Sequence, residues 1–249
     1  MEFSRLLTYL AADFDRLRAV AARDLTAPVP SCPGWTVTDL ARHVAEVYMH
    51  KVECMRQGRS PADWPPDLTG EEPIALLDRA YADLRAEFAQ RGPLDPSYTW
   101  YEPDQSVGFW IRRMAQETVI HRIDAELALG EPVMPVADDL AVDGVDEVLV
   151  VFLSYISRRW PEELGPALKE ASGETVRVGT GARSWSVTAT PQGVEVGTGD
   201  PGTVAAVITG PPDPLLRWLW GRGGDDEILF DGDPAAVAQL RRLLVAATQ

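Results

Sequence analysis

The stretch around which this chain is organised reads Gln116-Glu117-Thr118-Val119-Ile120-His121-Arg122-Ile123-Asp124-Ala125-Glu126. On a helix, residues four apart lie one above the other at about 6 Å, so Glu117 and His121 aim a carboxylate and an imidazole at one point. Such a pair can chelate a divalent cation, which needs at least one further ligand. The chain has 3 histidines, so the other imidazole candidates are His43 and His50.

The polar pattern extends along the same helical line. Arg113, Glu117 and His121 share one stripe, and Asp124 lies one turn further on, so polar groups recur where a buried stripe would be apolar. The same spacing fits an exposed ladder of side-chain pairs, each worth roughly a few tenths of a kcal/mol. These residues alone favour neither interpretation.

A second predicted helix, at 37–56, supplies the residue that favours a metal site. His43 lies beside its apolar inward face, where a lone histidine is commonly a core residue. In a bundle, however, His43 can meet Glu117 and His121 across the interior. Two imidazoles and one carboxylate are the ligand set of catalytic zinc with an open position. The neighbours expected to orient these ligands are Arg113 and Asp124.

Other residues offer rival chemistry. His50 and Cys54, four apart on the same predicted helix, make an alternative metal pair or a Cys/His nucleophile. Cys54 lies about 16 Å from His43 at 1.5 Å per residue, and core packing explains it better. Cys32 precedes Pro33-Gly34 in a loop, with no nearby group that would activate its thiol.

Helical periodicity dominates the first part of the chain. Apolar residues spaced three and four apart predict helices at 3–23, 37–56, 74–90, 107–129 and 140–159. The first four are joined by loops and suit an up-and-down bundle, whose interior commonly holds metal ligands from facing helices. We therefore predict an N-terminal helical bundle over residues 1–160.

The pattern changes after Pro161, which ends the last of these helices and begins a connection to residue 173. Beyond it, alternating residues predict strands at 175–178, 184–188, 194–196, 203–209 and 228–230. Helical spacing predicts two further helices, at 213–220 and 234–247. The expected fold class is therefore α plus α+β, with a small C-terminal α+β domain at 170–249. Two domains agree with a length of 249 residues.

Composition excludes several kinds of partner. The formal net charge of -15, from 38 acidic against 23 basic residues, opposes the phosphates of nucleic acids and the anionic face of membranes. The N-terminus lacks the continuous apolar core of a signal peptide, and no apolar run approaches the ~20 residues of a membrane span. The 2 cysteines are too few for a disulfide framework. We expect a cytoplasmic protein with reduced thiols.

Two motifs together resemble a known family. They read Ser31-Cys32-Pro33-Gly34-Trp35-Thr36-Val37-Thr38-Asp39-Leu40-Ala41-Arg42-His43-Val44 and Glu117-x3-His121-Arg122-x-Asp124-Ala125. Their order and separation are similar to those of the mycothiol-dependent maleylpyruvate isomerase family. Short stretches of the second domain resemble that family's sterol-carrier-protein-like C-terminal domain, at 205–210, 219–222 and 230–234.

The resemblance implies a DinB-like bundle that binds a divalent metal, with zinc the expected ion, through His43, Glu117 and His121. It also implies the low-molecular-weight thiol mycothiol as cosubstrate, in an actinobacterial cytoplasm. In this family an arginine of the C-terminal domain helps to bind the acidic substrate. Arg222 is our candidate for that catalytic role, and Arg217 is its alternative.

The function implied is that of a metal-dependent isomerase or thiol transferase acting on a small unsaturated acid. A thiol with a pKa of about 8.5 becomes a thiolate on Zn²⁺, and its sulfur can add to a conjugated double bond. Rotation about the resulting single bond and loss of the thiol give isomerisation, whereas retention gives transfer. The alternatives are a metal-binding or small-molecule-binding protein without catalysis and a metal-assisted hydrolase. A monomer and a dimer are both compatible with the sequence.

Overall fold

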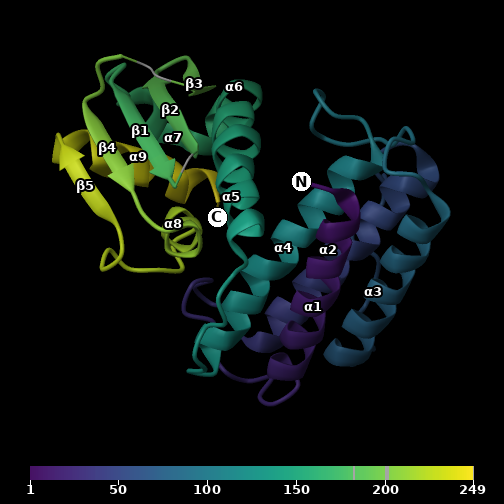
Figure 1. The fold of residues 1–249 in the computed structure, drawn as a ribbon. Helices are drawn as coiled ribbons and strands as arrows, with labels where there is room; N and C mark the ends of the chain where they lie inside the picture. The colour runs from purple at the N-terminus through teal and green to yellow at the C-terminus, as the bar shows by residue number, and fades with distance from the viewer. Residues whose placement is uncertain (182, 200–201, 249) are drawn as a thin grey trace. The chain divides into compact units, whose positions relative to one another are not determined.

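The computed structural model describes residues 1–181, 183–199 and 202–248, and the chain divides into two compact units, Met1–Met134 and Pro135–Gln249 (Figure 1). The first unit is helical and the second combines a sheet with helices. The predicted fold class, a helical bundle followed by an α+β domain, is confirmed. Within the described ranges, no helix combines the length and the apolarity needed to cross a membrane.

Four long helices build the first unit: α1 (Phe3–Ala21), α2 (Val37–Gln57), α3 (Pro73–Gln90) and α4 (Val107–Ala128). They lie side by side in Figure 1, where α1 packs against α4, and α2 packs against both α3 and α4. The observed ends fall within two residues of the predicted ones. The bundle thus forms where apolar residues recur at helical spacing, because each helix buries its apolar stripe against its neighbours.

Local hydrogen bonds fix where the two helices of the candidate site begin. Thr36 caps α2 in a capping box, in which Asp39 Oδ2 accepts from the Thr36 backbone N–H at 2.8 Å. Ser106 caps α4 by accepting from the backbone N–H of Phe109 at 3.3 Å. The hydroxyls of Tyr48 and Thr118 hydrogen-bond at 2.5 Å and tie the middles of α2 and α4 together.

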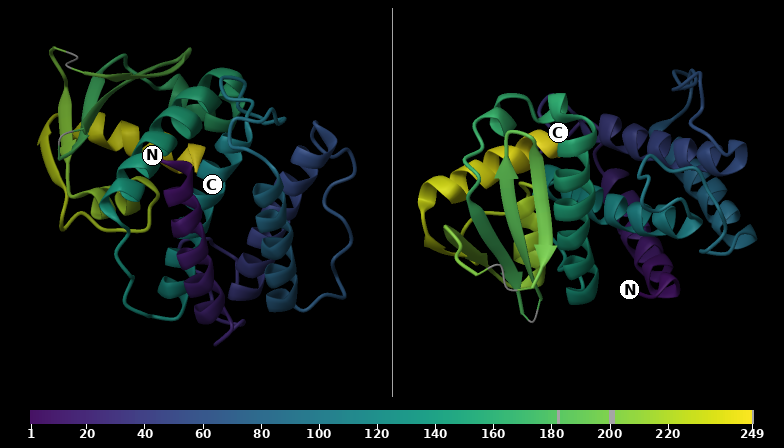
Figure 2. Two further views of the ribbon diagram at one scale, coloured as in Figure 1. Left: turned by 45° about the vertical axis from the view of Figure 1, so that its right-hand side comes forward. Right: turned by 90° about the horizontal axis from the view of Figure 1, so that it is seen from above.

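The second unit is built on a five-stranded sheet of order β3-β2-β1-β4-β5. Its strands are β1 (Thr175–Thr180), β2 (Arg183–Thr190), β3 (Gly193–Thr198), β4 (Ala206–Thr209) and β5 (Leu229–Gly232). Neighbouring strands are antiparallel, except that β1 and β4 are parallel. Helices α8 (Pro212–Leu219) and α9 (Pro234–Ala247) complete the predicted pattern, and α9 packs across β1, β4 and β5 (Figure 2).

The predicted helix at 140–159 belongs to the second unit, whereas the sequence analysis placed it in a first domain of residues 1–160. It consists of α5 (Asp138–Glu147), a π-helical segment η1 (Val148–Tyr155) and α6 (Ile156–Arg159). Two hydrogen bonds join this helical segment, residues 138–159, to the sheet. Trp185 Nε1 donates to Asp146 at 2.9 Å, and Ser154 Oγ donates to the Val194 carbonyl at 2.9 Å. Such tertiary contacts leave no trace in helical periodicity.

One helix of the second unit was not predicted, because its sequence contains helix breakers. Helix α7 (Pro161–Lys169) occupies the first part of the expected connection at 161–173. Pro161 stands in the first turn, where its missing N–H costs nothing. The chain kinks at Gly165, with φ 48°, and Pro166 follows the kink.

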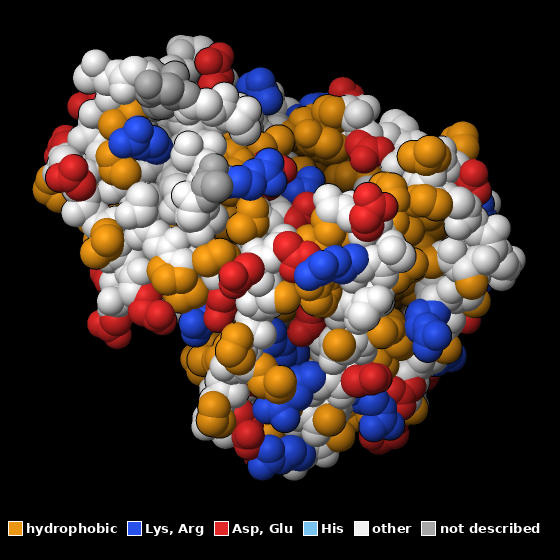
Figure 3. Space-filling view, viewed as in Figure 1, with side chains coloured by type: hydrophobic (Ala, Val, Ile, Leu, Met, Phe, Trp, Pro, Cys, Tyr) orange, Lys and Arg blue, Asp and Glu red, His pale blue; other side chains and the backbone are white. Residues whose placement is uncertain are grey.

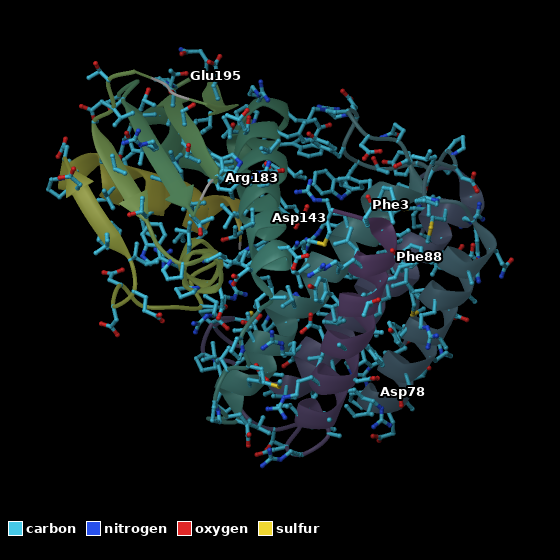
Figure 4. All side chains as sticks on the ribbon, viewed as in Figure 1. Phe3, Asp78, Phe88, Asp143, Arg183 and Glu195 are labelled. Atoms are coloured by element: carbon cyan, nitrogen blue, oxygen red, sulfur yellow. The ribbon has the colours of Figure 1, made fainter. Side chains whose placement is uncertain are left out.

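Gly108 allows the start of α4 to approach its neighbours closely. Its N–H donates to the Pro93 carbonyl at 2.7 Å, and a Cβ there would lie 2.6 Å from the ring of Phe3, labelled in Figure 4, and 2.9 Å from Pro93 O. We predict that Gly108→Ala lowers the free energy of unfolding of the first unit by about 1–3 kcal/mol through overpacking. Urea titration measures this change.

Gly70→Ala is the matched control, because no atom lies within 4 Å of the position of its added Cβ. We expect little change in stability from it. Equal stability of the Gly108 and Gly70 variants would contradict the close packing at the start of α4.

Candidate metal centre

Helices α2 and α4 bring together the three side chains that the sequence analysis selected. One ligand atom each of His43, Glu117 and His121 lies within 4.8 Å of the other two. Oε1 of Glu117 lies 3.3 Å from His43 Nε2 and 3.2 Å from His121 Nε2. The two imidazole rings meet edge to face, with their centroids 5.0 Å apart. Two nitrogens and one oxygen thus converge from facing helices.

The stripe of α4 that carries these groups is buried. Every residue from Arg113 to Glu126 is buried, which excludes the exposed ladder that the spacing alone also allowed. The side chain of His43 is 37% exposed, whereas those of Glu117 and His121 are 11% and 10% exposed. The candidate centre is therefore reached from solvent along its His43 side.

Asp124 holds the imidazole of His121 in place. Its Oδ2 lies 2.9 Å from His121 Nδ1, so the ring presents Nε2 to Glu117. The other carboxylate oxygen accepts from the Ser31 hydroxyl, and Cys32 Sγ lies 3.8 Å from Oδ2. A carboxylate behind a ligating histidine is the usual arrangement in metal centres. Cys32 faces a negative charge, which does not activate its thiol.

Arg113 forms an ion pair with Oε2 of Glu117, so that Oε1 faces the imidazoles. Burial by itself raises the pKa of Glu117, but the charges of Arg113 and His121 hold it well below its ordinary value. Burial lowers the pKa of His121, but Glu117 and Asp124 raise it to about 9. Glu117 and Asp124 thus stabilise a positive charge on or beside the imidazole of His121.

The donor set fits a divalent metal ion. Imidazole nitrogens and a carboxylate oxygen are the ligands that catalytic zinc takes, at about 2.0–2.2 Å. Glu117 Oε1 lies at 3.2 and 3.3 Å from the two Nε2 atoms, so all three donors can reach one ion placed between them. Three protein ligands leave a coordination position for a further ligand. Metal binding at these residues stays a prediction.

Two residues of the loop before α2 contribute to the centre and were not selected as site residues from the sequence. Trp35 packs against the ring of His43 with centroids 4.9 Å apart, and Ser31 donates its hydroxyl to Asp124. Both lie within the first of the two motifs that carry the family resemblance. That motif was the available signal, because spacing arguments do not reach from a loop to a helix.

The rival pair, His50 and Cys54, has a different environment. Cys54 Sγ lies 3.5 Å from His50 Nδ1, but no third His, Cys, Asp or Glu joins them in a possible metal group among the residues that the structure describes. Burial raises the pKa of the Cys54 thiol and lowers that of His50 to about 4. A protonated thiol beside a weakly basic imidazole is not an activated nucleophile.

Arg222 lies in the second unit, just after α8. Its Nη1 donates to the Trp220 carbonyl at 2.7 Å, and its guanidinium carbon lies 5.9 Å from the centre of the Trp220 ring. The alternative, Arg217, donates Nε to Asp213 at 2.9 Å. Arg217 is thus already paired with a carboxylate. The role of Arg222 in substrate binding stays a prediction.

The fold and the centre define a class of protein: a two-domain chain whose N-terminal helical bundle carries a His/Glu/His candidate metal centre. Residues 7–126 match the family model "Mycothiol maleylpyruvate isomerase N-terminal domain", and residues 139–239 match the "MDMPI C-terminal domain". The chain belongs to the mycothiol-dependent maleylpyruvate isomerase family, as the resemblance predicted.

Solved structures support the fold. Two crystal structures described as the mycothiol-dependent maleylpyruvate isomerase, one of them a mutant, superpose with TM-scores of 0.63 and 0.62. Each is 14% identical and covers 93% of this chain and 93% of its own. No curated protein matches the sequence.

We predict that His43→Ala and His121→Ala abolish stoichiometric metal uptake, because either change leaves only two donors from the protein. The metal content of the purified full-length chain, measured by inductively coupled plasma mass spectrometry, checks this. His50→Ala is the control and should retain metal. Full metal content in both the His43 and His121 variants would rule out this centre.

Proposed function

We propose that this protein is a metal- and mycothiol-dependent isomerase or thiol transferase that acts on a small unsaturated carboxylic acid in the cytoplasm. The convergence of His43, Glu117 and His121 in the bundle is the observation that carries the proposal. Membership of the family and the likeness to structures described as the mycothiol-dependent maleylpyruvate isomerase support it.

Zinc is the ion we expect, held by His43, Glu117 and His121. When bound there, it supplies the charge that keeps a thiol deprotonated at neutral pH. The partly exposed edge of His43 faces solvent, so a thiol and an electrophile can approach from that side.

The surrounding residues keep the donors in position. Asp124 lies 2.9 Å from Nδ1 of His121 and orients the ring so that Nε2 is directed toward Glu117. Arg113 binds Oε2 of Glu117 and keeps Oε1 turned toward the imidazoles. Both contacts lie within one helix, so the geometry of the donors depends on α4 remaining intact.

In the second unit, we infer that Arg222 binds the carboxylate of the acid. A guanidinium is matched to a carboxylate in shape and can also stabilise the enolate charge that develops when a thiol adds to a conjugated acid. The Trp220 carbonyl accepts a hydrogen bond from Nη1 and restrains this side chain.

Three protein ligands favour catalysis over storage, because closed structural sites use four. Hydrolysis would require a general base beside the ion. Asp124, the nearby carboxylate, already accepts from His121 and Ser31, so it is not suited to that role.

The experiment that tests the proposal incubates zinc-loaded protein with mycothiol and a panel of unsaturated acids that includes maleylpyruvate. Products are followed by mass spectrometry and NMR. We expect isomerised acid or a thiol adduct, formed only when both metal and thiol are present. Products formed from water without thiol would favour a hydrolase, and substrate binding without turnover would favour a non-catalytic binding protein.

We predict that Arg222→Ala lowers kcat/KM by about 10- to 100-fold, the effect of losing a hydrogen bond to a charged group, while the metal content stays normal. Arg242→Ala, at an exposed position of α9, is the control and should leave turnover unchanged. A loss of turnover in Arg217→Ala, together with normal turnover in Arg222→Ala, would assign the role to Arg217 instead.

A further inference from the structure

Lys51 lies on α2 and faces the stripe of α4 that carries the candidate centre. Its Nζ lies 5.1 Å from the centre of the Trp110 ring. Trp110 starts the stripe that continues through Arg113 to Glu117, and seven residues of helix between Trp110 and Glu117 correspond to about 10 Å. Lys51 therefore marks one end of a helix face whose other end is the candidate metal centre.

The pairing of α2 with α4 supports this placement. His43 of α2 meets Glu117 of α4, and Tyr48 meets Thr118 through a hydrogen bond of 2.5 Å. The helices run antiparallel, because His43 near the start of α2 meets Glu117, whereas Lys51 further along α2 lies beside Trp110, closer to the start of α4. The charge of Glu117 raises the pKa of Lys51 and that of Arg113 lowers it, both more weakly than burial does.

The ammonium of Lys51 has no carboxylate partner among the described residues. Its hydrogen-bond partner there is Nδ1 of His50, at 3.2 Å, and the same Nδ1 lies 3.5 Å from Cys54 Sγ. An ammonium carries three N–H donors, so one imidazole satisfies only part of its capacity. By contrast, Arg113 on the facing helix is bound to a carboxylate. In a chain with a formal net charge of -15, a partly buried cation without a carboxylate is unusual.

The imidazole beside Lys51 does not compensate its charge. Burial lowers the pKa of His50 to about 4, so His50 is neutral at pH 7 and only accepts a hydrogen bond. Burial lowers the pKa of Lys51 itself to about 8, which leaves the amine mostly protonated at neutral pH. Binding of an anion would stabilise this charged form. The ring of Trp110, which is itself fully buried, covers one side of the ammonium.

We propose that Lys51 is a substrate-binding residue, which pairs with a second carboxylate of the unsaturated acid, distinct from the one assigned to Arg222, while the electrophilic carbon lies toward the metal centre. This assignment rests on the proposed function and gives it a substrate class: acids that carry a carboxylate several bonds from the carbon attacked by sulfur. The amine contributes through its charge, so no covalent bond to Lys51 forms.

Kinetics test the charge. In zinc-loaded full-length protein with mycothiol, Lys51→Met should raise KM for the acid about 10- to 100-fold, the effect of losing a hydrogen bond to a charged group. It should leave the metal content unchanged and have little effect on the corresponding ester or amide of the acid. The control is Lys169→Met, which replaces the chain's other lysine, an exposed residue of α7.

A second measurement uses the unaltered protein and needs no turnover. Reductive methylation followed by mass spectrometry reports the reactivity of both lysines, and fumarate, an unsaturated dicarboxylate, should slow the modification of Lys51 but not that of Lys169. This readout still applies if Lys51→Met fails to fold.

The two proposals can fail separately. Turnover in the wild type, with an unchanged KM in Lys51→Met and no protection by fumarate, would overturn the role of Lys51 and leave the proposed function in place. Protection of Lys51 without turnover on any thiol and acid would support the anion site while removing the proposed function.

Discussion

The first unit depends on balancing a negative charge inside a helical bundle. A carboxylate without partners in such an interior would cost several kcal/mol. Glu117 is balanced by Arg113 on one oxygen and faces two imidazoles with the other. About two turns further on, Asp124 is balanced by His121 and Ser31. Both buried carboxylates at the candidate centre therefore face a cationic or hydrogen-bonding partner. This pairing allows α4 to carry them inside the bundle.

The same rule organises the end of α4 away from the centre. Arg122 binds Asp13 at 3.1 Å and Glu126 at 2.7 Å, and Arg16 binds Glu126 at 2.8 Å. Both carboxylates of this network are paired with arginines, so it anchors α1 to α4. Lys51 differs because its partner is a neutral imidazole. Charged side chains also mix over the face shown in Figure 3, where red and blue groups are interspersed.

Much of this arrangement follows from local patterns. Spacing of apolar residues located α1 to α4, and the four-residue step from Glu117 to His121 placed both side chains on one face. Whether that face was buried was not encoded locally, because it depends on which helices cover it. For the same reason the helix predicted at 140–159 was assigned to the first domain, whereas its side chains hydrogen-bond to the sheet of the second unit. Helix α7 escaped detection because proline can begin a helix as well as end one.

The hydrogen bond from Ser31 to Asp124 makes the connection between α1 and α2 a structural component of the centre. An insertion or deletion in that connection would shift the hydroxyl, release the carboxylate behind His121 and loosen the imidazole, with all three donors still present in the sequence. The length of the loop between the first two helices would therefore affect how tightly the proposed ion is held, and relatives that keep the donors but differ in this loop should differ in metal affinity.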